Sequence, residues 1–469
     1  MLFSSPEFLY YFLPITLILY FITPMPQGSP RLRNSVLLLA SLIFYAWGEP
    51  KYVLLMAAQC ASAWAFGLLI DKYRGQKASK VWMIVSAAVS FSGLIFFKYA
   101  NFFITNVNNA INGHIPLIGL LMPVGISFYT FQIVSYTFDL YKGQTEVQRS
   151  VIDFSTYVAL FPQLIAGPIV RYADVAREIG RREHSLPRFS MGVRRFIIGL
   201  GKKMLLANMF GELVDIYKKS NGTSVLFVWV YIIAYSLQIY FDFSGYSDMA
   251  IGLGHVFGFK FLENFNYPYI ADSITNFWRR WHMSLSSWFR DYVYIPLGGN
   301  RVPKWRHAFN ILVVWALTGF WHGADWNFIL WGAFFGVVLL AEKFFLGKLL
   351  EKTPKAVRHI YVMLVVFVSW AFFDAAGLGV SFGVIGRMFG AGAGALADRE
   401  ALYYLRSYAL PLIIGIIGAT PLPKFLAGKA AEKKALVTAL EPLILAALLI
   451  AATACMVDGS FNPFIYFRF

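Results

Sequence analysis

Charged residues are scarce in this sequence of 469 residues: they make up 14% of the chain, whereas 58% of the residues are hydrophobic. Because soluble domains carry about a quarter charged residues, this composition excludes an ordinary soluble protein and indicates an integral protein of a lipid bilayer. The formal net charge is +16, but the basic residues lie in short loops between apolar runs, which is typical of cytoplasmic loops. We therefore expect no nucleic-acid partner.

Cysteine is almost absent, since the chain has only Cys60 and Cys455, each within an apolar run. Two isolated cysteines give no metal-ligand spacing, so we expect two packing residues and no metal site. The N-terminal residues also lack the basic stretch and the clear cleavage site of a signal peptide. The first apolar run, Phe8–Thr23, is therefore predicted to be a retained membrane span.

The motifs of soluble enzymes are missing as well. The sequence has no G-x-S-x-G elbow, no Walker A loop, no H-E-x-x-H and no G-x-G-x-x-G placed after a strand. These absences exclude the familiar hydrolase, nucleotide-binding and zinc-protease sites. Any catalysis has to come from residues within the membrane region.

Long apolar runs fill the chain, and one further run, Val151–Val170, is broken by proline and glycine and could be re-entrant. We expect about twelve crossings (11–13 transmembrane or re-entrant helices) and hence an all-α, polytopic fold with one membrane domain over residues 1–469. The basic loops place both termini outside, so residues 461–469 form an extracytoplasmic tail. The runs are Phe8–Thr23, Asn34–Trp47, Tyr52–Ile70, Val81–Phe97, Ile115–Tyr141, Phe196–Ile216, Leu226–Phe243, Ile311–Phe320, Phe328–Phe345, Tyr361–Phe373, Tyr403–Leu422 and Ala435–Met456.

One histidine lies between two of these runs. His322 separates Ile311–Phe320 from Phe328–Leu340. An ionisable side chain at that depth is costly and usually faces a cavity or a polar partner. Imidazole also moves protons readily near neutral pH. His322 is therefore a candidate catalytic residue, and the alternative is a buried histidine satisfied by one hydrogen bond.

The segment Asp272–Asn300 is rich in tryptophan and arginine. Its pattern predicts an amphipathic helix at the cytoplasmic membrane surface. A surface anchor explains most of its residues, but Arg279, Arg280 and Arg290 could hold the phosphates of a donor from the cytosol. His282 lies near the apolar stripe and is a second candidate for a polar role. The predicted stripe is Trp278, Trp281, Leu285, Trp288 and Phe289.

Several polar residues lie within or beside the spans, and four of them are candidates for supporting the site. A carboxylate inside a membrane is a functional candidate by default, in a proton path or orienting a histidine. Hydrogen bonding between helices is the alternative for most of the uncharged ones. The four residues are Asp242, Ser244, Asn276 and Asn327.

Three segments together resemble the signatures of the membrane-bound O-acyltransferases: Phe277–His282, Tyr292–Asn300 and Gly319–Asn327. The chain is most similar to the bacterial alginate O-acetyltransferase-like branch, with the D-alanyl transferases of teichoic acid as cousins. Pro123–Gly143 and Phe161–Pro168 also match that branch, as does the opening Met-Leu-Phe-Ser-Ser. The resemblance covers nearly the whole chain.

The resemblance implies a helical bundle pierced by a tunnel, with His322 as the essential histidine and His282 at the second, upstream polar position. It implies a cytoplasmic thioester donor, acetyl-coenzyme A or an acyl carrier protein, and no bound cofactor. It also implies the bacterial cytoplasmic (inner) membrane, a polysaccharide reached indirectly, and a separate extracytoplasmic SGNH-like acyltransferase or transfer protein as partner.

The last residues also resemble a C-terminal aromatic motif of this branch, over Phe464–Phe469. The resemblance implies that Tyr466 relays the acyl group. A phenol with a pKa near 10 is a better leaving group than a sugar hydroxyl, so an acyl-tyrosine would keep much of the thioester's transfer potential. Composition alone favours an aromatic anchor at the membrane interface.

Two classes of function remain open on the sequence. The first is an enzyme that passes an acetyl group across the membrane to O-acetylate an exopolysaccharide such as alginate or cellulose, with D-alanyl or peptidoglycan acyl transfer as variants. The second is a proton-coupled or polysaccharide transporter, because a buried carboxylate such as Asp242 suits a proton relay equally well.

Overall fold

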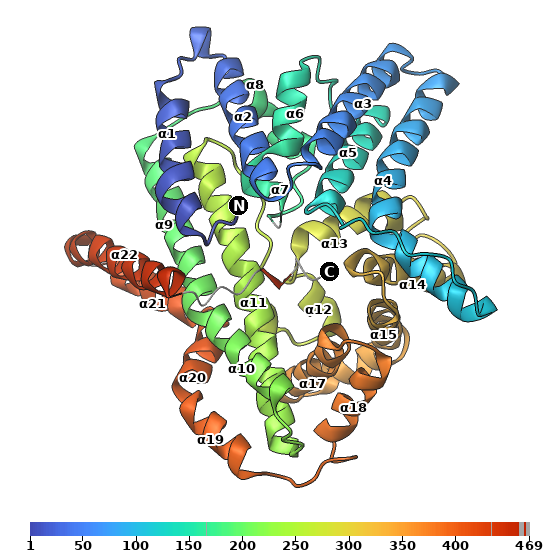
Figure 1. Cartoon of the computed structure of the whole chain (residues 1–469), viewed down its shortest axis with the longest axis vertical. Helices are drawn as coiled ribbons and strands as arrows, with labels where there is room; N and C mark the ends of the chain where they lie inside the picture. The colour runs from blue at the N-terminus through green and yellow to red at the C-terminus, as the bar shows by residue number, and fades with distance from the viewer. Residues whose placement is uncertain (166, 433, 459–463, 466–469) are drawn as a thin grey trace. The chain divides into compact units, whose positions relative to one another are not determined.

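The computed structural model describes residues 1–165, 167–432, 434–458 and 464–465, and these residues form helices, turns and loops without any strand (Figure 1). The prediction of an all-α fold is confirmed. The chain separates into two compact units: unit 1 comprises Met1–Phe196 and Tyr246–Glu263, and unit 2 comprises Ile197–Gly245 and Asn264–Phe469. The boundary between them falls within helices α9 and α11.

Unit 1 begins with a helical hairpin and continues through longer antiparallel helices. Helices α3, α4 and α5 pack against one another, and α2 packs against α6. Its elements are η1 (Phe8–Phe12), α1 (Leu13–Ile22), η2 (Pro26–Gly28), α2 (Arg31–Gly48), α3 (Val53–Lys72), α4 (Lys77–Ile111), α5 (Ile126–Tyr141), α6 (Val151–Ala159), α7 (Phe161–Leu164), α8 (Tyr172–Gly180) and most of α9 (Leu186–Gly201).

Unit 2 holds the segments with the candidate histidines. Its elements are η3 (Lys202–Ala207), α10 (Asn208–Lys219), most of α11 (Val225–Val256), η4 (Pro268–Ile270), α12 (Ile274–Trp278), α13 (Met283–Phe289), η5 (Arg290–Tyr294), α14 (Lys304–His322), α15 (Trp326–Ala341), η6 (Glu342–Leu346), α16 (Gly347–Lys352), α17 (Lys355–Asp374), α18 (Leu378–Met388), α19 (Arg399–Ser407), α20 (Ala409–Gly418), α21 (Leu422–Ala431) and α22 (Lys434–Val457).

Six of the described helices are long and apolar enough to cross a membrane, or up to seven if the bent pair α19 and α20 is one span. The chain is thus a multi-pass membrane protein, but several predicted runs form shorter helices. The run Ile115–Tyr141 becomes helical only at Ile126, because Pro123 precedes it and Gly125 takes a left-handed φ of 78°. The broken run Val151–Val170 divides into α6 and α7, as its proline suggested.

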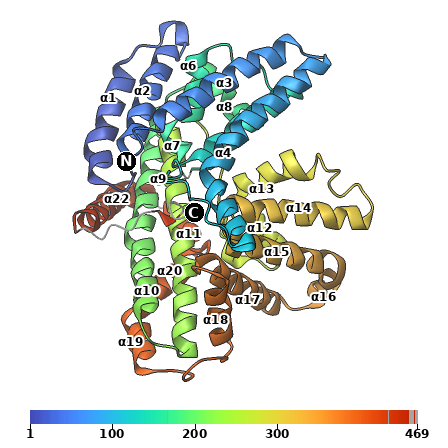
Figure 2. The same cartoon turned by 45° about the vertical axis from the view of Figure 1, so that its right-hand side comes forward.

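Aromatic side chains dominate the core of unit 2. Helices α10 and α11 run side by side (Figure 2), and Tyr217 stacks on Tyr231 with ring centroids 4.3 Å apart. Helices α14 and α15 pack backbone against backbone at Gly319 and Gly332, where an added Cβ would collide with the backbone of the opposite helix. Small residues at such a crossing let membrane helices pack backbone to backbone. This packing fixes the end of α14, where His322 lies.

The prediction of one continuous amphipathic helix over Asp272–Asn300 is wrong. The segment instead forms α12, a turn, α13 and the π-helical stretch η5. The break occurs at His282, which has a left-handed φ of 43°. An L-residue adopts that conformation only where its surroundings compensate for the strain. The residues of the predicted stripe are nevertheless buried, so they form core rather than a surface anchor; they are Trp278, Trp281, Leu285, Trp288 and Phe289.

Candidate active site

His322 is the last residue of α14 and only 4% of it is exposed. Aromatic rings surround it edge to face: the ring centroids of Trp321, Trp331 and Phe373 lie 4.9, 5.0 and 5.2 Å from that of the imidazole. Such walls exclude water, and electrostatic interactions are stronger inside them than in solution. The structure therefore places the predicted base in a dry aromatic setting.

His282 directly precedes α13 and is 1% exposed. Its Nδ1 lies 3.2 Å from Oδ1 of Asn264, which also accepts hydrogen bonds from the backbone N–H and the hydroxyl of Ser284, at 3.2 and 2.9 Å. Because the amide oxygen can only accept, Nδ1 carries the ring proton and donates it to Asn264. Burial lowers the pKa of His282 to about 3. The ring is therefore neutral at physiological pH.

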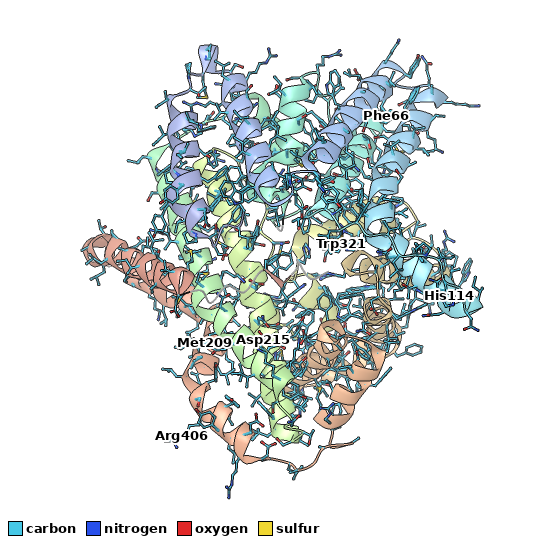
Figure 3. The ribbon with its side chains drawn as sticks, viewed as in Figure 1. Phe66, His114, Met209, Asp215, Trp321 and Arg406 are labelled. Atoms are coloured by element: carbon cyan, nitrogen blue, oxygen red, sulfur yellow. The ribbon has the colours of Figure 1, made fainter. Side chains whose placement is uncertain are left out.

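One indole links the surroundings of the two histidines. Trp321, labelled in Figure 3, directly precedes His322 in the sequence, and its ring centroid lies 6.0 Å from that of His282. His282 also packs edge to face on Phe243, at 4.7 Å. The two predicted histidines thus share one aromatic pocket, although they lie 40 positions apart in the sequence.

A cavity of about 540 Å³ opens beside this pocket in unit 2. Arg279 and Arg290 line it together with His282. Thr318, one helical turn before His322 on α14, lines it as well. The cavity therefore joins two guanidinium groups to the aromatic pocket, an arrangement suited to an elongated, anionic acyl donor. Arg290 also pairs with Asp291, with Nε 2.6 Å from Oδ1.

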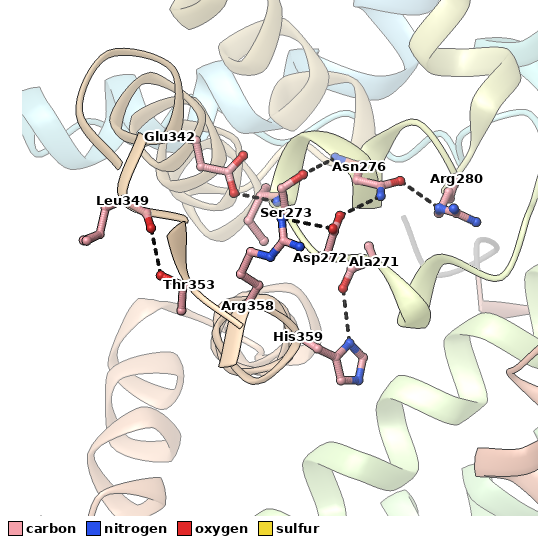
Figure 4. A network of polar contacts seen from close by, with 11 residues as sticks. Ala271, Asp272, Ser273, Asn276, Arg280, Glu342, Leu349, Thr353, Arg358 and His359 are labelled. Carbon is pink, nitrogen blue, oxygen red and sulfur yellow. Dashed lines mark hydrogen bonds and ion pairs between the residues drawn. The ribbon is translucent and has the colours of Figure 1, made fainter. Parts of the chain in front are cut away.

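The third predicted donor-binding arginine, Arg280, lies elsewhere. Its Nε donates to Oδ1 of Asn276 at 2.7 Å (Figure 4). Its Nη1 donates to the backbone oxygen of Asn266 at 3.1 Å. Asn276 in turn donates from Nδ2 to Asp272, at 2.9 Å. The structure therefore gives Arg280 and Asn276 a role in holding the loop before His282, and neither residue lines the cavity.

A buried carboxylate anchors the same loop. Glu342 accepts hydrogen bonds from the backbone N–H groups of Ile274 and Thr275, at 2.6 and 3.0 Å, and from the Thr275 hydroxyl at 2.9 Å. These are donors of the first turn of α12, where a negative charge is favourable. Because Thr275 lines the cavity, Glu342 fixes one wall of it.

The remaining supporting candidates have separate places. Asn327 lies in the first turn of α15 and donates from Nδ2 to the backbone oxygen of Ala375, at 2.6 Å. Ser244 is buried on α11. Asp242, on the same helix, forms a buried ion pair with Lys203. Among the described residues, no group of three or more histidine, cysteine, aspartate or glutamate side chains is placed to hold a metal ion.

Two described residues near the C-terminus are buried in unit 2. Phe464 and Ile465 are 2% and 3% exposed, and the backbone N–H of Ile465 donates to Oδ2 of Asp242 at 2.7 Å. The Phe464 ring lies 5.8 Å from that of Phe243, which also contacts His282. Tyr466 follows directly in the sequence but lies outside the described residues.

Sequence reasoning missed three residues of this region: Asn264, Glu342 and Lys203. Asn264 stands in an irregular loop with no periodicity to single it out. Glu342 and Lys203 lie within apolar runs, and the rule that intramembrane charges are functional candidates would have found both.

Comparison with known proteins decides the family. Residues 147–381 match the model of the membrane-bound O-acyltransferases, and the chain is 39% identical to a probable alginate O-acetylase of Azotobacter vinelandii over 100% of both chains. This chain belongs to the membrane-bound O-acyltransferase family. It is 40% identical to a probable alginate O-acetylase of Pseudomonas aeruginosa, over 85% of this chain and 76% of the relative. It is 34% identical to a peptidoglycan O-acetyltransferase of Helicobacter pylori, over 83% of this chain and 80% of the relative.

Membership confirms the resemblance drawn from the sequence motifs, and the protein is an O-acyltransferase that crosses the membrane several times. The enzyme hypothesis is thereby confirmed over the transporter hypothesis. The motif residues of Phe277–His282 and Gly319–Asn327 meet in the structure around the aromatic pocket, through the contact of His282 with Trp321.

Proposed function

We propose that this protein takes an acetyl group from a cytoplasmic thioester and passes it across the bacterial cytoplasmic (inner) membrane for O-acetylation of a cell-envelope polysaccharide. The observation that carries the proposal is the cavity that reaches from Arg279 and Arg290 to His282, with its wall residue Thr318 one helical turn from His322. The relatives named as alginate O-acetylases and as a peptidoglycan O-acetyltransferase support acetyl as the acyl group.

The donor is acetyl-coenzyme A. Arg279 and Arg290 line the cavity, and guanidinium groups bind phosphate with paired, charge-assisted hydrogen bonds. The phosphates of coenzyme A would lie against these arginines and its acetyl thioester in the aromatic pocket. An acyl carrier protein, the competing donor, brings only one phosphate on its prosthetic group.

His322 is the general base of the transfer. It takes the phenolic proton of Tyr466 as the phenol oxygen attacks the thioester carbonyl, the carbon–sulfur bond breaks, and the imidazolium returns the proton to the leaving thiolate. The products are an acetyl ester of Tyr466 and free coenzyme A. A positioned base of this kind contributes about 10²–10⁴ in rate, and the covalent intermediate divides one hard step into two. Neutral His282, fixed by Asn264, positions the reacting groups.

The second step occurs on the extracytoplasmic side. A hydroxyl nucleophile of a separate SGNH-like acyltransferase or transfer protein attacks the ester carbonyl, the bond to the tyrosine oxygen breaks, and Tyr466 regains its proton. The partner then acetylates the polysaccharide, so acceptor choice among alginate, cellulose and peptidoglycan lies with the partner. D-alanyl transfer would use the same two steps with a different acyl group.

The test compares donors directly. The purified protein in lipid vesicles is given acetyl-coenzyme A, an acetylated acyl carrier protein or a D-alanylated carrier protein, and release of the free thiol is measured. We expect release of about one equivalent of coenzyme A from acetyl-coenzyme A without the periplasmic partner, and continuous turnover when the partner is added. Thiol release from the acetylated carrier protein but not from acetyl-coenzyme A would overturn the donor assignment. Thiol release from the D-alanylated carrier protein only would overturn the acetyl assignment.

A further inference from the structure

Ile465, near the C-terminus, contacts a buried polar site that the transfer chemistry does not itself require. The two carboxylate oxygens of Asp242, on α11, have different partners. Oδ1 lies 2.7 Å from Nζ of Lys203, and Oδ2 accepts a hydrogen bond from the backbone N–H of Ile465 at 2.7 Å. The side chains of Asp242 and Lys203 are 2% and 5% exposed. A buried peptide N–H needs an acceptor, and Asp242 supplies a charged one.

A buried ion pair is weak grounds for stability, because an apolar pair of similar volume often stabilises a protein equally well. What an apolar pair cannot supply is the acceptor for Ile465. The pair therefore has a specific role at Ile465. Lys203 compensates the charge of Asp242, and Asp242 holds the backbone N–H of Ile465.

The local backbone is built to bring the pair together. An ideal Cβ at Gly245 would lie 2.7 Å from the backbone oxygen of Gly199 and 3.2 Å from the backbone nitrogen of Lys203. Only glycine at 245, less than one turn after Asp242, lets the π-helical stretch η3 approach α11 this closely. Such π-helical stretches occur frequently at functional sites.

The helix that leads to the tail packs on the same region. Leu448 of α22 contacts Gly201, directly before η3, and an ideal Cβ at Gly201 would lie 2.8 Å from Leu448 Cδ1. Helix α22 thus packs on the stretch that carries Lys203.

The docked segment lies next to the active-site pocket. Phe243, the residue after Asp242, packs on Phe464 with centroids 5.8 Å apart and on His282 at 4.7 Å. Ile465 belongs to the aromatic core of unit 2 together with Trp281 and Trp331. One aromatic ring, that of Phe243, therefore lies between Phe464 and His282.

We propose that Lys203, Asp242 and Phe243 form a tail-docking site that holds the C-terminal segment at Phe464–Ile465 and sets its register for acyl transfer. Asp242 and Lys203 are positioning residues: they act through the tail, and neither lines the cavity. The inference rests on the proposed function for the role of Tyr466, but the docking itself does not depend on that role.

The test uses two double variants that differ only in the acceptor. Lys203→Met with Asp242→Asn keeps a side-chain oxygen for the Ile465 N–H, whereas Lys203→Met with Asp242→Leu removes it at nearly the same size. Both variants remove the two buried charges together, so neither leaves an unpaired charge in the core. Each is made in a Cys60→Ala, Cys455→Ala background with Ile465→Cys as a reporter of burial, and Lys202→Met serves as the matched lysine control.

The readout is the rate at which a membrane-permeant maleimide labels the thiol introduced by Ile465→Cys in the full-length protein. We expect slow labelling in the reporter parent, the Lys202→Met control and the Asn variant, and labelling faster by about tenfold or more in the Leu variant, since a buried hydrogen-bond acceptor is lost. Equal protection in the Leu and Asn variants would overturn the tail-docking site.

A second variant keeps the test decisive if the Leu variant does not fold. Ile465→Pro deletes the donor N–H from the tail and leaves the Lys203–Asp242 pair intact, and Ile465→Val retains it. With Phe464→Cys as the reporter, we expect fast labelling for proline and slow labelling for valine. Equal labelling would refute the hydrogen bond as the docking element.

Activity then separates docking from the relay. The Leu variant should lose polysaccharide acetylation about tenfold or more with the donor KM unchanged, and the Asn variant should restore most of it. If Tyr466→Phe keeps full acetylation while the labelling results hold, the relay fails and the docking site stands. If labelling is unaffected, the docking site fails whatever Tyr466 does.

Discussion

His322 and His282 share one aromatic pocket but differ in what surrounds them. His322 ends a long helix and packs against the rings of Trp331 and Phe373. His282 is fixed by Asn264 in a strained backbone conformation. His282, strained and held by a buried amide, is therefore suited to orienting the reacting groups. His322, at the end of the helix, is suited to proton transfer.

His322→Gln should lower the rate of thiol release from acetyl-coenzyme A by about 10²-fold or more, because the amide cannot act as a base. His282→Gln should lose less, since only positioning is affected. Initial rates in vesicles measure both, with the exposed His114→Gln as control and detergent-solution melting to confirm folding. Substantial activity in well-folded His322→Gln would make His322 structural, and equal losses would indicate joint catalysis.

His282 should also give the protein a pH-dependent stability. The pKa of His282 in the folded protein is about 3, whereas its value in the unfolded chain is near 6.5. Between these pH values His282 is protonated in the unfolded chain and neutral in the folded protein. The stability that His282 contributes is full above about pH 6.5 and falls by about 1.4 kcal/mol per pH unit as the pH drops toward 3. The difference in melting temperature between wild type and His282→Gln should therefore narrow from pH 7 to pH 5. A constant difference would contradict the neutral, buried imidazole.

At the scale of elements, the segment from α12 to η5 forms one wall of the cavity. A residue of another element holds this segment in place. Glu342 accepts three hydrogen bonds at the start of α12. Asp272, Asn276 and Arg280 form a chain of side-chain contacts within the segment. The order of this wall therefore depends on helix α15 and its continuation η6 as much as on its own sequence.

Glu342→Ala should lower the stability by about 1–3 kcal/mol, because the N–H groups of Ile274 and Thr275 lose their buried acceptor. Glu342→Gln keeps one oxygen and should cost less. Thermal unfolding in detergent measures both, with the exposed Glu351→Ala as control. An unchanged melting temperature for Glu342→Ala would show that other groups satisfy the start of α12.

Arg279→Gln and Arg290→Gln should raise the KM for acetyl-coenzyme A more than they lower kcat, because contacts to the phosphates are equal in the ground and transition states. Initial-rate kinetics checks this, with the exposed Arg301→Gln as control. Coenzyme A lacking its 3′-phosphate should lessen the effect of whichever arginine binds that group. An unchanged KM for both variants would contradict the assignment of these arginines to the donor phosphates.

At the scale of the whole molecule, the sequence predicted what depends on local pattern. The apolar runs indicated an all-α membrane protein, and the surroundings of His322 marked it as a candidate. The break at His282 was not predictable from periodicity, because its left-handed conformation depends on Asn264, 18 positions away. Likewise, Glu342 contacts Ile274 across 68 positions, and no local pattern reports such a contact.

The end of the chain shows the same limit. Its composition favours an interface anchor, yet Phe464 and Ile465 are buried in unit 2, where Ile465 donates a hydrogen bond to Asp242, 223 positions away. Fewer of the described helices are long and apolar enough to cross a membrane than the sequence has apolar runs, because proline and glycine within runs such as Ile115–Tyr141 shorten the helices that form.

The most direct measurement of the proposed relay is the mass of the C-terminal peptide after a single turnover. The purified protein is mixed with acetyl-coenzyme A without its periplasmic partner, quenched in acid, digested and analysed by mass spectrometry. We predict one added acetyl group on the peptide that contains Tyr466, absent in Tyr466→Phe and in His322→Gln and removed when the partner is added. Full polysaccharide acetylation by Tyr466→Phe, with no acetylated peptide in the wild type, would contradict the relay.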